Sequence, residues 1–316
     1  MESNSNLGLH LRPKVKIMKN VTVIGAGTMG NGIAHVFAQY GYHVILCDVS
    51  LAALEKAMIT IDKNLGRMVE KQKLTEQQRH ETMNRLVTTS DLPAAVRHAD
   101  LVVEAATEKL DIKLKIFKEI DENAPVDCIL ATNTSSISIT LIASVTKRPE
   151  KVIGMHFMNP VPVIKLIEVI RGFSTSREVC DVIMDITRQM DKVPVEVKDY
   201  PGFVANRLLM VMINEAIHTL YEGICGVEEI DTIMKLGMSH LMGPLQLADF
   251  IGLDVCLSIM NVIHDGFANP KYAPSPLLIN MVNAGLLGVK SGHGFYVYSK
   301  ESKDLVVNPR FEKRFS

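Results

Sequence analysis

The chain has 316 residues, of which 47% are hydrophobic and 22% charged, and its formal net charge is −1. This composition is typical of a globular protein with two domains. With no run of 18 apolar residues, it gives no reason to expect nucleic acid or a membrane as a partner. The five cysteines are scattered and odd in number, which indicates a reducing, cytoplasmic compartment and no structural zinc or other metal site.

Residues 1–17 lack the apolar segment of a signal peptide. They are basic, with Arg12, Lys14 and Lys16 against Glu2, so a transit peptide is an alternative. Because Met18 directly precedes the first expected strand, we predict that residues 1–17 form a disordered extension.

A complete dinucleotide-binding pattern occupies residues 19–48. An apolar run at 21–24 predicts a buried strand, and the loop Gly-Ala-Gly-Thr-Met-Gly follows at 25–30. A helical pattern and a second apolar run, which ends at Asp48, complete a βαβ unit. Such a loop permits a tight turn, close approach of a pyrophosphate and close packing of the helix. The predicted loop contacts with the cofactor are Gly25, Gly27, Thr28, Met29 and Gly30.

Asp48 indicates which dinucleotide is bound. Its carboxylate can accept hydrogen bonds from the adenosine ribose hydroxyls, whereas a 2′-phosphate would meet a like charge. No Arg occurs at 49–52 to reverse this preference, so we predict NAD rather than NADP.

Strand and helix patterns alternate as far as residue 200, which predicts a Rossmann-type, doubly wound parallel sheet in an NAD-binding domain over residues 18–200. Ligands are expected at the carboxyl ends of the strands, where Glu104, Glu108 and Ser135 occur. We include Asn133 among the predicted cofactor contacts. The predicted helices are 50–71, 75–83, 110–122 and 176–190, and the further strands are near 86–87, 100–105, 128–131, 152–156, 164–170 and 193–197.

The predicted helix at 50–71 has a basic outer face that includes Lys56 and Lys71. Such a face is usually only solvated. The alternative is a docking surface for an anionic substrate carrier.

His156 and Glu168 stand on two expected strands joined by the turn Asn159-Pro160-Val161-Pro162. Strands so connected can bring residues twelve positions apart side by side. A carboxylate beside a histidine fixes its tautomer and stabilises the imidazolium, as a dehydrogenase needs in the base that removes a hydroxyl proton. The alternative is a core histidine bonded to a backbone carbonyl, with Glu168 on a solvated face.

A second, all-helical domain is predicted over residues 201–316, with helices at 203–221, 227–236, 243–264 and 275–284. Asn206 falls on the apolar stripe of the first helix, so its amide needs a polar partner. That partner could be a substrate oxygen or a structural link to the preceding domain. Ser135 could similarly contact substrate or serve as a turn residue.

The motifs taken together resemble the L-3-hydroxyacyl-CoA dehydrogenase family, especially bacterial 3-hydroxybutyryl-CoA dehydrogenases. The resemblance extends over about residues 18–299. It is carried by GAGTMG, NTSS, HFMNPVPVIKLIEVI, DYPGFVANRLL, MGPLQLADFIGLD and KSGHGFY. His293 departs from the Arg often found in the last motif.

The resemblance implies oxidation of (S)-3-hydroxyacyl-CoA with NAD, with His156 as base and Glu168 as its partner. It also implies that Ser135 and Asn206 contact substrate, that Asn159 lies beside the site, and that Glu108 and Lys113 lie near the nicotinamide. Lys56 and Lys71 are candidate contacts for the CoA phosphates.

Two alternatives remain at this level, an L-gulonate 3-dehydrogenase and a non-catalytic NAD-binding protein of the lambda-crystallin kind. The very apolar segments at 208–217 and 241–260 predict a homodimer through the helical domain. Members of the resembling family are commonly dimeric through this domain.

Overall fold

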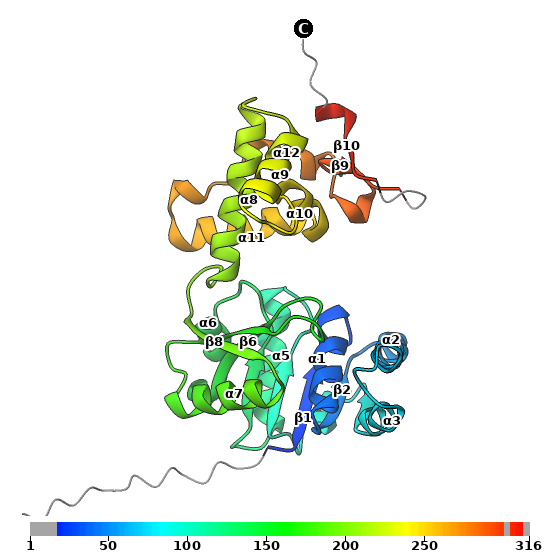
Figure 1. Ribbon diagram of the computed structural model, residues 1–316. Helices are drawn as coiled ribbons and strands as arrows, with labels where there is room; N and C mark the ends of the chain where they lie inside the picture. The colour runs from blue at the N-terminus through cyan, green and yellow to red at the C-terminus, as the bar shows by residue number, and fades with distance from the viewer. Residues whose placement is uncertain (1–17, 300–303, 312–316) are drawn as a thin grey trace, which may run out of the picture. The chain divides into compact units, whose positions relative to one another are not determined.

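The structure is a computed structural model that describes residues 18–299 and 304–311 (Figure 1). The predicted disorder of residues 1–17 concerns positions outside this described part. Contacts divide the chain into two compact units. We call residues 18–134 and 139–198 the Rossmann unit, and Ser135–Ser138 together with the chain from Asp199 onward the helical unit.

An eight-stranded sheet forms the centre of the Rossmann unit, in the order β3-β2-β1-β4-β5-β6-β7-β8. Neighbouring strands are parallel except for β6 and β7, which are antiparallel. The strand order reverses beside β1, the position at which open α/β sheets bind ligands. The strands are β1 Asn20–Ile24, β2 His43–Cys47, β3 Leu86–Thr89, β4 Leu101–Glu104, β5 Ile129–Thr132, β6 Val152–Phe157, β7 Leu166–Arg171 and β8 Val193–Lys198.

Helices cover both faces of this sheet. In β1 and in β4 to β7 the odd-numbered residues, such as Val23 and Val103, share one apolar core with α1, α2 and α7, and in β2 and β3 the even-numbered residues do so. The alternate residues face other helices, since Thr22 donates its hydroxyl to the Ala95 carbonyl of α4 and Gly154 adjoins Ile139 of α6. The helices are α1 Thr28–Gln39, α2 Leu51–Glu70, α3 Glu76–Asn84, α4 Leu92–Val96, α5 Leu110–Asn123, α6 Ile139–Ala143 and α7 Arg177–Gln189.

Side-chain caps explain where several of these helices begin. Ser50 accepts a hydrogen bond from the N–H of Ala53 at the start of α2, and Ser176 does the same at the start of α7. Thr75 and Gln78 form a reciprocal capping box on α3. The helices α4 and α6 are each five residues long, too short to produce the periodic pattern from which the longer helices were predicted.

The helical unit has its own apolar core, built by five α-helices and a short sheet. The α-helices are α8 Ala205–Tyr221, α9 Val227–Thr232, α10 Pro244–Ile251, α11 Leu253–Phe267 and α12 Pro276–Asn283, and the antiparallel sheet pairs β9 Tyr296–Val297 with β10 Val306–Val307. Single turns of 3₁₀ or π-helix occupy Ile233–Gly237, Pro270–Tyr272, Val289–Ser291 and Pro309–Phe311, and the Rossmann unit contains one further 3₁₀ turn at Pro149–Lys151.

The prediction of one helix over 243–264 is wrong, because the chain breaks at Gly252. Gly252 has a φ of 103°, which lies outside the helical region and which other residues rarely adopt. The two helices α10 and α11 therefore meet at 97°. Within the described residues, no single helix is long and apolar enough to cross a membrane.

Two buried carboxylates fasten the sheet of the helical unit to its helices. Asp249 accepts the backbone N–H groups of Phe295 and Tyr296, and Asp231 accepts the Tyr296 hydroxyl and the N–H of Leu245. Burial raises the pKa of Asp249 to about 6, although the hydrogen bonds oppose this shift. These contacts hold Phe295 and Tyr296 against α9 and α10.

Candidate active site

The glycine-rich loop has the geometry that close packing at the end of β1 requires. Gly25 has a φ of 99°, and a Cβ there would lie 2.5 Å from the Ala105 carbonyl oxygen. A Cβ on Gly30 would overlap the carbonyl oxygen of Gly25. Gly27 differs, because nothing lies within 4 Å of the position its Cβ would occupy. Space for a pyrophosphate is therefore open at Gly27.

The helix α1 begins at Thr28, so Thr28, Met29 and Gly30 of the glycine-rich motif form its first turn. Gly27 is its N-cap and supplies no side-chain acceptor to the first turn. The first N–H groups of the helix therefore remain available to an anionic ligand. The amide of Asn31 donates back to the Gly27 carbonyl at 2.7 Å, which fixes the turn.

Asp48 stands at the end of β2 and is bound to the loop. Its carboxylate accepts the N–H of Ala26 at 2.7 Å and that of Ser50 at 2.9 Å. Asp48 and Gly25 line a cavity of about 630 Å³ whose apolar wall includes Ile112 and Ile116 of α5. An apolar wall beside the Asp48 carboxylate suits an adenine and its ribose.

The charges of this cavity distinguish between NAD and NADP. Asp48, Asp91 and Glu119 line it, and none of the described residues along its wall is Lys or Arg. Burial and these neighbouring carboxylates raise the pKa of the Cys47 thiol to about 11, so Cys47 adds no charge at neutral pH. A 2′-phosphate would meet only negative charge here, which favours the predicted NAD.

His156 and Glu168 lie directly opposite each other on β6 and β7. Both side chains are buried, and Nδ1 of His156 is 2.8 Å from Oε2 of Glu168. The carboxylate fixes the ring orientation and balances an imidazolium, so the arrangement can exchange a proton at Nε2. Among the described residues, no group of three or more His, Cys, Asp or Glu side chains is placed to hold a metal ion.

Three predicted cofactor residues lie beyond the carboxyl ends of β4 and β5: Glu108 follows β4, Lys113 stands on α5, and Asn133 follows β5. Lys113 is buried and lies 3.6 Å from Glu108, whose other oxygen accepts the Thr134 hydroxyl at 2.7 Å. Asn133 accepts the N–H of Phe157 through Oδ1 at 2.9 Å, which joins this group to the strand that carries His156.

A second cavity, of about 510 Å³, lies on the other side of the glycine-rich loop. It is bounded by the loop and the start of α1, by one face of α2, and by the turn at Asn159–Pro162. Lys56 lines it, together with Asn159. Lys71 is the exposed C-cap of α2, fifteen residues after Lys56 and about 22 Å away at the rise of an α-helix, and it does not line this cavity.

Ser135 and Asn206 come together within the helical unit. The Asn206 amide donates to the backbone carbonyl of Ser135 at 2.8 Å. The sequence left open whether the Asn206 amide binds a substrate oxygen or a structural group. This bond gives it a structural partner. Both residues are half-buried.

The sequence did not identify Lys192, which supports the turn at Asn159–Pro162 beside the second cavity. Its buried ammonium donates to the carbonyls of Val161 and Ile164, both at 2.7 Å, and so fixes the turn that carries Asn159. Burial lowers the pKa of Lys192. A single lysine before a strand carries no recognisable sequence signal.

Thr60 and Asn64, which line the second cavity, could have been found from the sequence, because their spacing places them on the same face of α2 as Lys56.

Comparisons with known proteins show which proteins this chain resembles. A Bacillus subtilis (strain 168) protein named probable 3-hydroxybutyryl-CoA dehydrogenase is 52% identical over 285 residues, which cover 90% of this chain and 99% of that protein. Human mitochondrial hydroxyacyl-coenzyme A dehydrogenase is 42% identical over 89% of this chain and 92% of its own. The crystal structure of (S)-3-hydroxybutyryl-CoA dehydrogenase from Ralstonia eutropha superposes with a TM-score of 0.87 at 48% identity, covering 90% of this chain and 100% of that one.

Two family models divide the chain between them. The model of the NAD binding domain of 3-hydroxyacyl-CoA dehydrogenase matches residues 20–200, and the model of the C-terminal domain of the same enzymes matches residues 202–298. The glycine-rich loop and Asp48 lie within the first match. The chain therefore belongs to the 3-hydroxyacyl-CoA dehydrogenase family and is an NAD-dependent oxidoreductase.

Proposed function

We propose that this protein oxidises (S)-3-hydroxybutyryl-CoA, or a similar short (S)-3-hydroxyacyl-CoA, to the 3-ketone and also catalyses the reverse reaction, with His156 as the acid–base residue. The observation that carries the proposal is the buried contact of 2.8 Å between His156 and Glu168. The names of the relatives from Bacillus subtilis and Ralstonia eutropha support the choice of substrate.

His156 and Glu168 divide the proton chemistry between them. In the oxidation, His156 accepts the hydroxyl proton at Nε2, because Nδ1 is held by the carboxylate. Bound NAD supplies the acceptor for the hydride that leaves the same carbon. Glu168 stabilises the imidazolium that forms. In the reverse direction the protonated His156 donates to the ketone oxygen.

The cavity beside α2 would hold part of the CoA carrier. It adjoins the glycine-rich loop and offers one ammonium, that of Lys56, to a phosphate. Asn159 on the opposite wall can bind a polar group of the same chain. Lys71, Ser135 and Asn206 stay predicted substrate contacts.

An assay with full-length protein tests the function directly. We expect loss of NADH absorbance when acetoacetyl-CoA is added. With L-gulonate and NAD⁺ as the comparison, we expect little NADH formation. Acetoacetate without its carrier serves as a control, and its turnover should be much slower. Faster turnover of L-gulonate than of 3-hydroxybutyryl-CoA would contradict the proposal.

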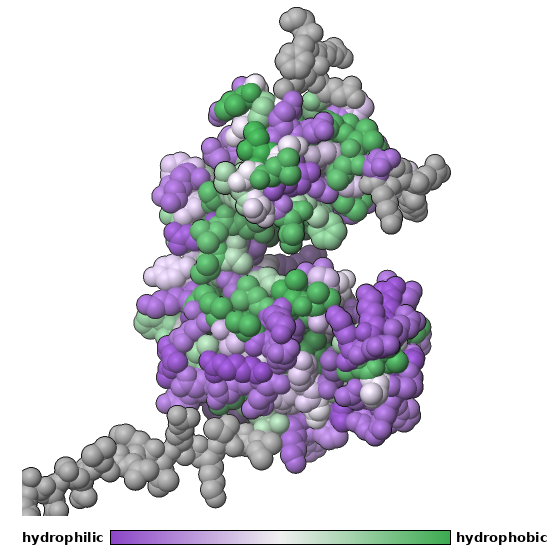
Figure 2. Space-filling model, in the orientation of Figure 1, coloured by the Kyte–Doolittle hydropathy of each residue, from purple (hydrophilic) through white to green (hydrophobic). Residues whose placement is uncertain are grey.

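The helical unit would also form a homodimer. It exposes Leu208, Leu236, Met238, Leu241 and Phe250, with exposed fractions that run from 61% for Met238 to 104% for Leu241. Apolar patches are visible over this unit in Figure 2. Exposed apolar surface of this extent usually marks an interface, and a two-fold dimer buries the same patch on both copies.

We expect light scattering at micromolar concentration to give about twice the 35.0 kDa mass of one chain. Changing Leu241 to Glu should lower this mass, because it places a charge on the apolar surface. Phe173 is 93% exposed on the Rossmann unit, so Phe173→Glu is the matched control and should leave the mass unchanged. A wild-type mass near 35.0 kDa, unaffected by concentration or NAD, would refute the dimer.

A further inference from the structure

Glu104 is a fully buried carboxylate at the end of β4, and the proton exchange described above does not use it. Its Oε1 accepts the N–H of Ala106 and the ammonium of Lys113, both at 2.9 Å. Its Oε2 accepts the same ammonium at 2.7 Å and the hydroxyl of Thr132 at 2.8 Å. Both oxygens act only as acceptors, which is the pattern of an ionised carboxylate.

These contacts continue into a closed ring. Thr132 accepts the N–H of Thr134 at 3.2 Å, and the Thr134 hydroxyl donates to Glu108 at 2.7 Å. Glu108 in turn lies 3.6 Å from the ammonium of Lys113, which returns to Glu104. The ring contains two carboxylates and one ammonium, so it carries one net negative charge.

The ring lies beside the His156–Glu168 pair, at the same edge and on the same face of the sheet. Glu104 pairs with Thr132, Thr132 pairs with Gly154, and His156 stands two residues further along the same strand. Even-numbered residues of these strands share one face. Asn133 donates its N–H to the Glu104 carbonyl and accepts that of Phe157, which joins the two groups.

This position adjoins the nicotinamide end of the cofactor. The loop after β1 and Asp48 after β2 suit the pyrophosphate and the adenosine, so the other half of the dinucleotide extends toward β4 and β5. The carbon that releases a hydride also bears the hydroxyl whose proton His156 accepts, so the nicotinamide must come close to His156. This step rests on the proposed function.

We propose that the negative ring distinguishes the two redox forms of the cofactor and that Glu104 is the positioning residue that supplies its buried charge. The nicotinamide ring of NAD⁺ carries a positive charge, whereas that of NADH is neutral. The ring therefore attracts NAD⁺ and has no such attraction for NADH. Glu104 also holds Lys113 away from the cation, since two of its contacts bind that ammonium.

Binding titrations of full-length protein test this inference. Kd for NADH is measured by nucleotide fluorescence and Kd for NAD⁺ by calorimetry. In Glu104→Gln we expect the ratio of Kd for NAD⁺ to Kd for NADH to rise roughly three- to tenfold, because one unit of nearby negative charge is lost. Glu108→Gln also removes one negative charge from the ring, but at an exposed position, so it should raise the same Kd ratio. If Glu104→Gln fails to fold, the Kd ratio of Glu108→Gln tests the charge effect.

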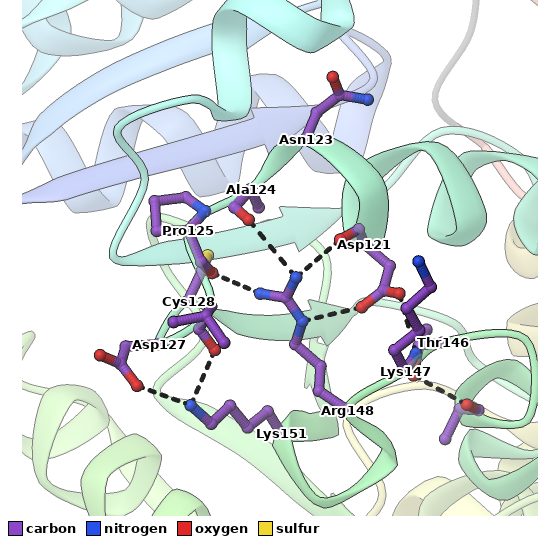
Figure 3. Close-up of polar contacts among 12 residues, drawn as sticks. Asp121, Asn123, Ala124, Pro125, Asp127, Cys128, Thr146, Lys147, Arg148 and Lys151 are labelled. Atoms are coloured by element: carbon purple, nitrogen blue, oxygen red, sulfur yellow. Dashed lines mark hydrogen bonds and ion pairs between the residues drawn. The ribbon is translucent and has the colours of Figure 1, made fainter.

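Asp121 provides a matched control on the same helix as Lys113. It is buried and accepts Nε of Arg148 and the N–H of Lys147, both at 2.8 Å (Figure 3). Asp121→Asn should lower stability through the loss of this buried ion pair and leave the Kd ratio unchanged.

Two results would overturn the inference. One is an unchanged ratio in both glutamate variants. The other is equal weakening of NAD⁺ and NADH, since that would make Glu104 purely structural. Failure of the proposed function gives a different result. If the Kd ratio changes as expected but the protein does not reduce acetoacetyl-CoA, the charge effect holds and the proposed substrate is wrong.

Discussion

Replacement of His156 by Gln should lower the turnover of acetoacetyl-CoA by about 10²–10⁴, the usual contribution of a positioned acid–base residue. The fold and the affinity for NADH should be retained, because the residue stands at the end of β6, away from Asp48 and the glycine-rich loop. Steady-state kinetics and an NADH titration on the same preparation measure both quantities. Turnover close to that of the wild type would refute the role of His156.

Glu168→Gln is the companion variant. It preserves the shape of the side chain but removes the charge 2.8 Å from Nδ1 of His156. The imidazolium loses its counter-charge, so turnover should fall and its pH profile should shift. A reduced rate with an unchanged pH profile would indicate that Glu168 only packs against the histidine.

The second large effect concerns Asp48. We expect the wild type to prefer NADH over NADPH by about 10²-fold in kcat/KM, because a 2′-phosphate next to a partly buried carboxylate costs about 2–4 kcal/mol. Asp48→Asn keeps an acceptor for the N–H of Ala26 and removes the charge. This variant should reduce the preference to about tenfold or less.

Glu119→Gln is the matched control for Asp48→Asn. Glu119 lines the same cavity from α5, so this variant makes the same change of charge away from the end of β2. It should alter the cofactor preference much less. An equal change in both variants would assign the preference to the total charge of the cavity rather than to Asp48.

The fold of the Rossmann unit could be predicted because its signals are local. Strands such as β4 and β5 are short, fully buried apolar runs, and caps such as Ser50 stand directly before the helix they begin. The helical unit was less predictable. Gly252 lies inside a continuous apolar pattern, and only its positive φ separates α10 from α11. The strand β10 forms by pairing with β9, which no local pattern encodes.

The candidate site also has one part that the sequence indicates and one part that it does not. The contact between His156 and Glu168 requires only two strands and one turn, so the spacing allowed it, and the resemblance to the dehydrogenase family favoured it over a core histidine bonded to a backbone carbonyl. The ring around Glu104 could not be expected, because it joins residues from β4, α5 and β5 through side chains whose directions depend on the assembled sheet. A carboxylate that ends a fully buried strand was its only visible signal.

The short segment Ser135–Ser138 limits where this chain can be cut into separate fragments. Its contacts place it in the helical unit, where the Asn206 amide binds the Ser135 carbonyl and the Ser138 hydroxyl donates to Asp199 at 2.7 Å. The chain therefore passes between the units three times, and the linker before Pro201 is not the only boundary. A fragment that ends at Lys198 keeps these four residues but loses the side chains that bind them. The two units are consequently not interchangeable modules, and exchange of a helical unit between relatives must carry this segment with it.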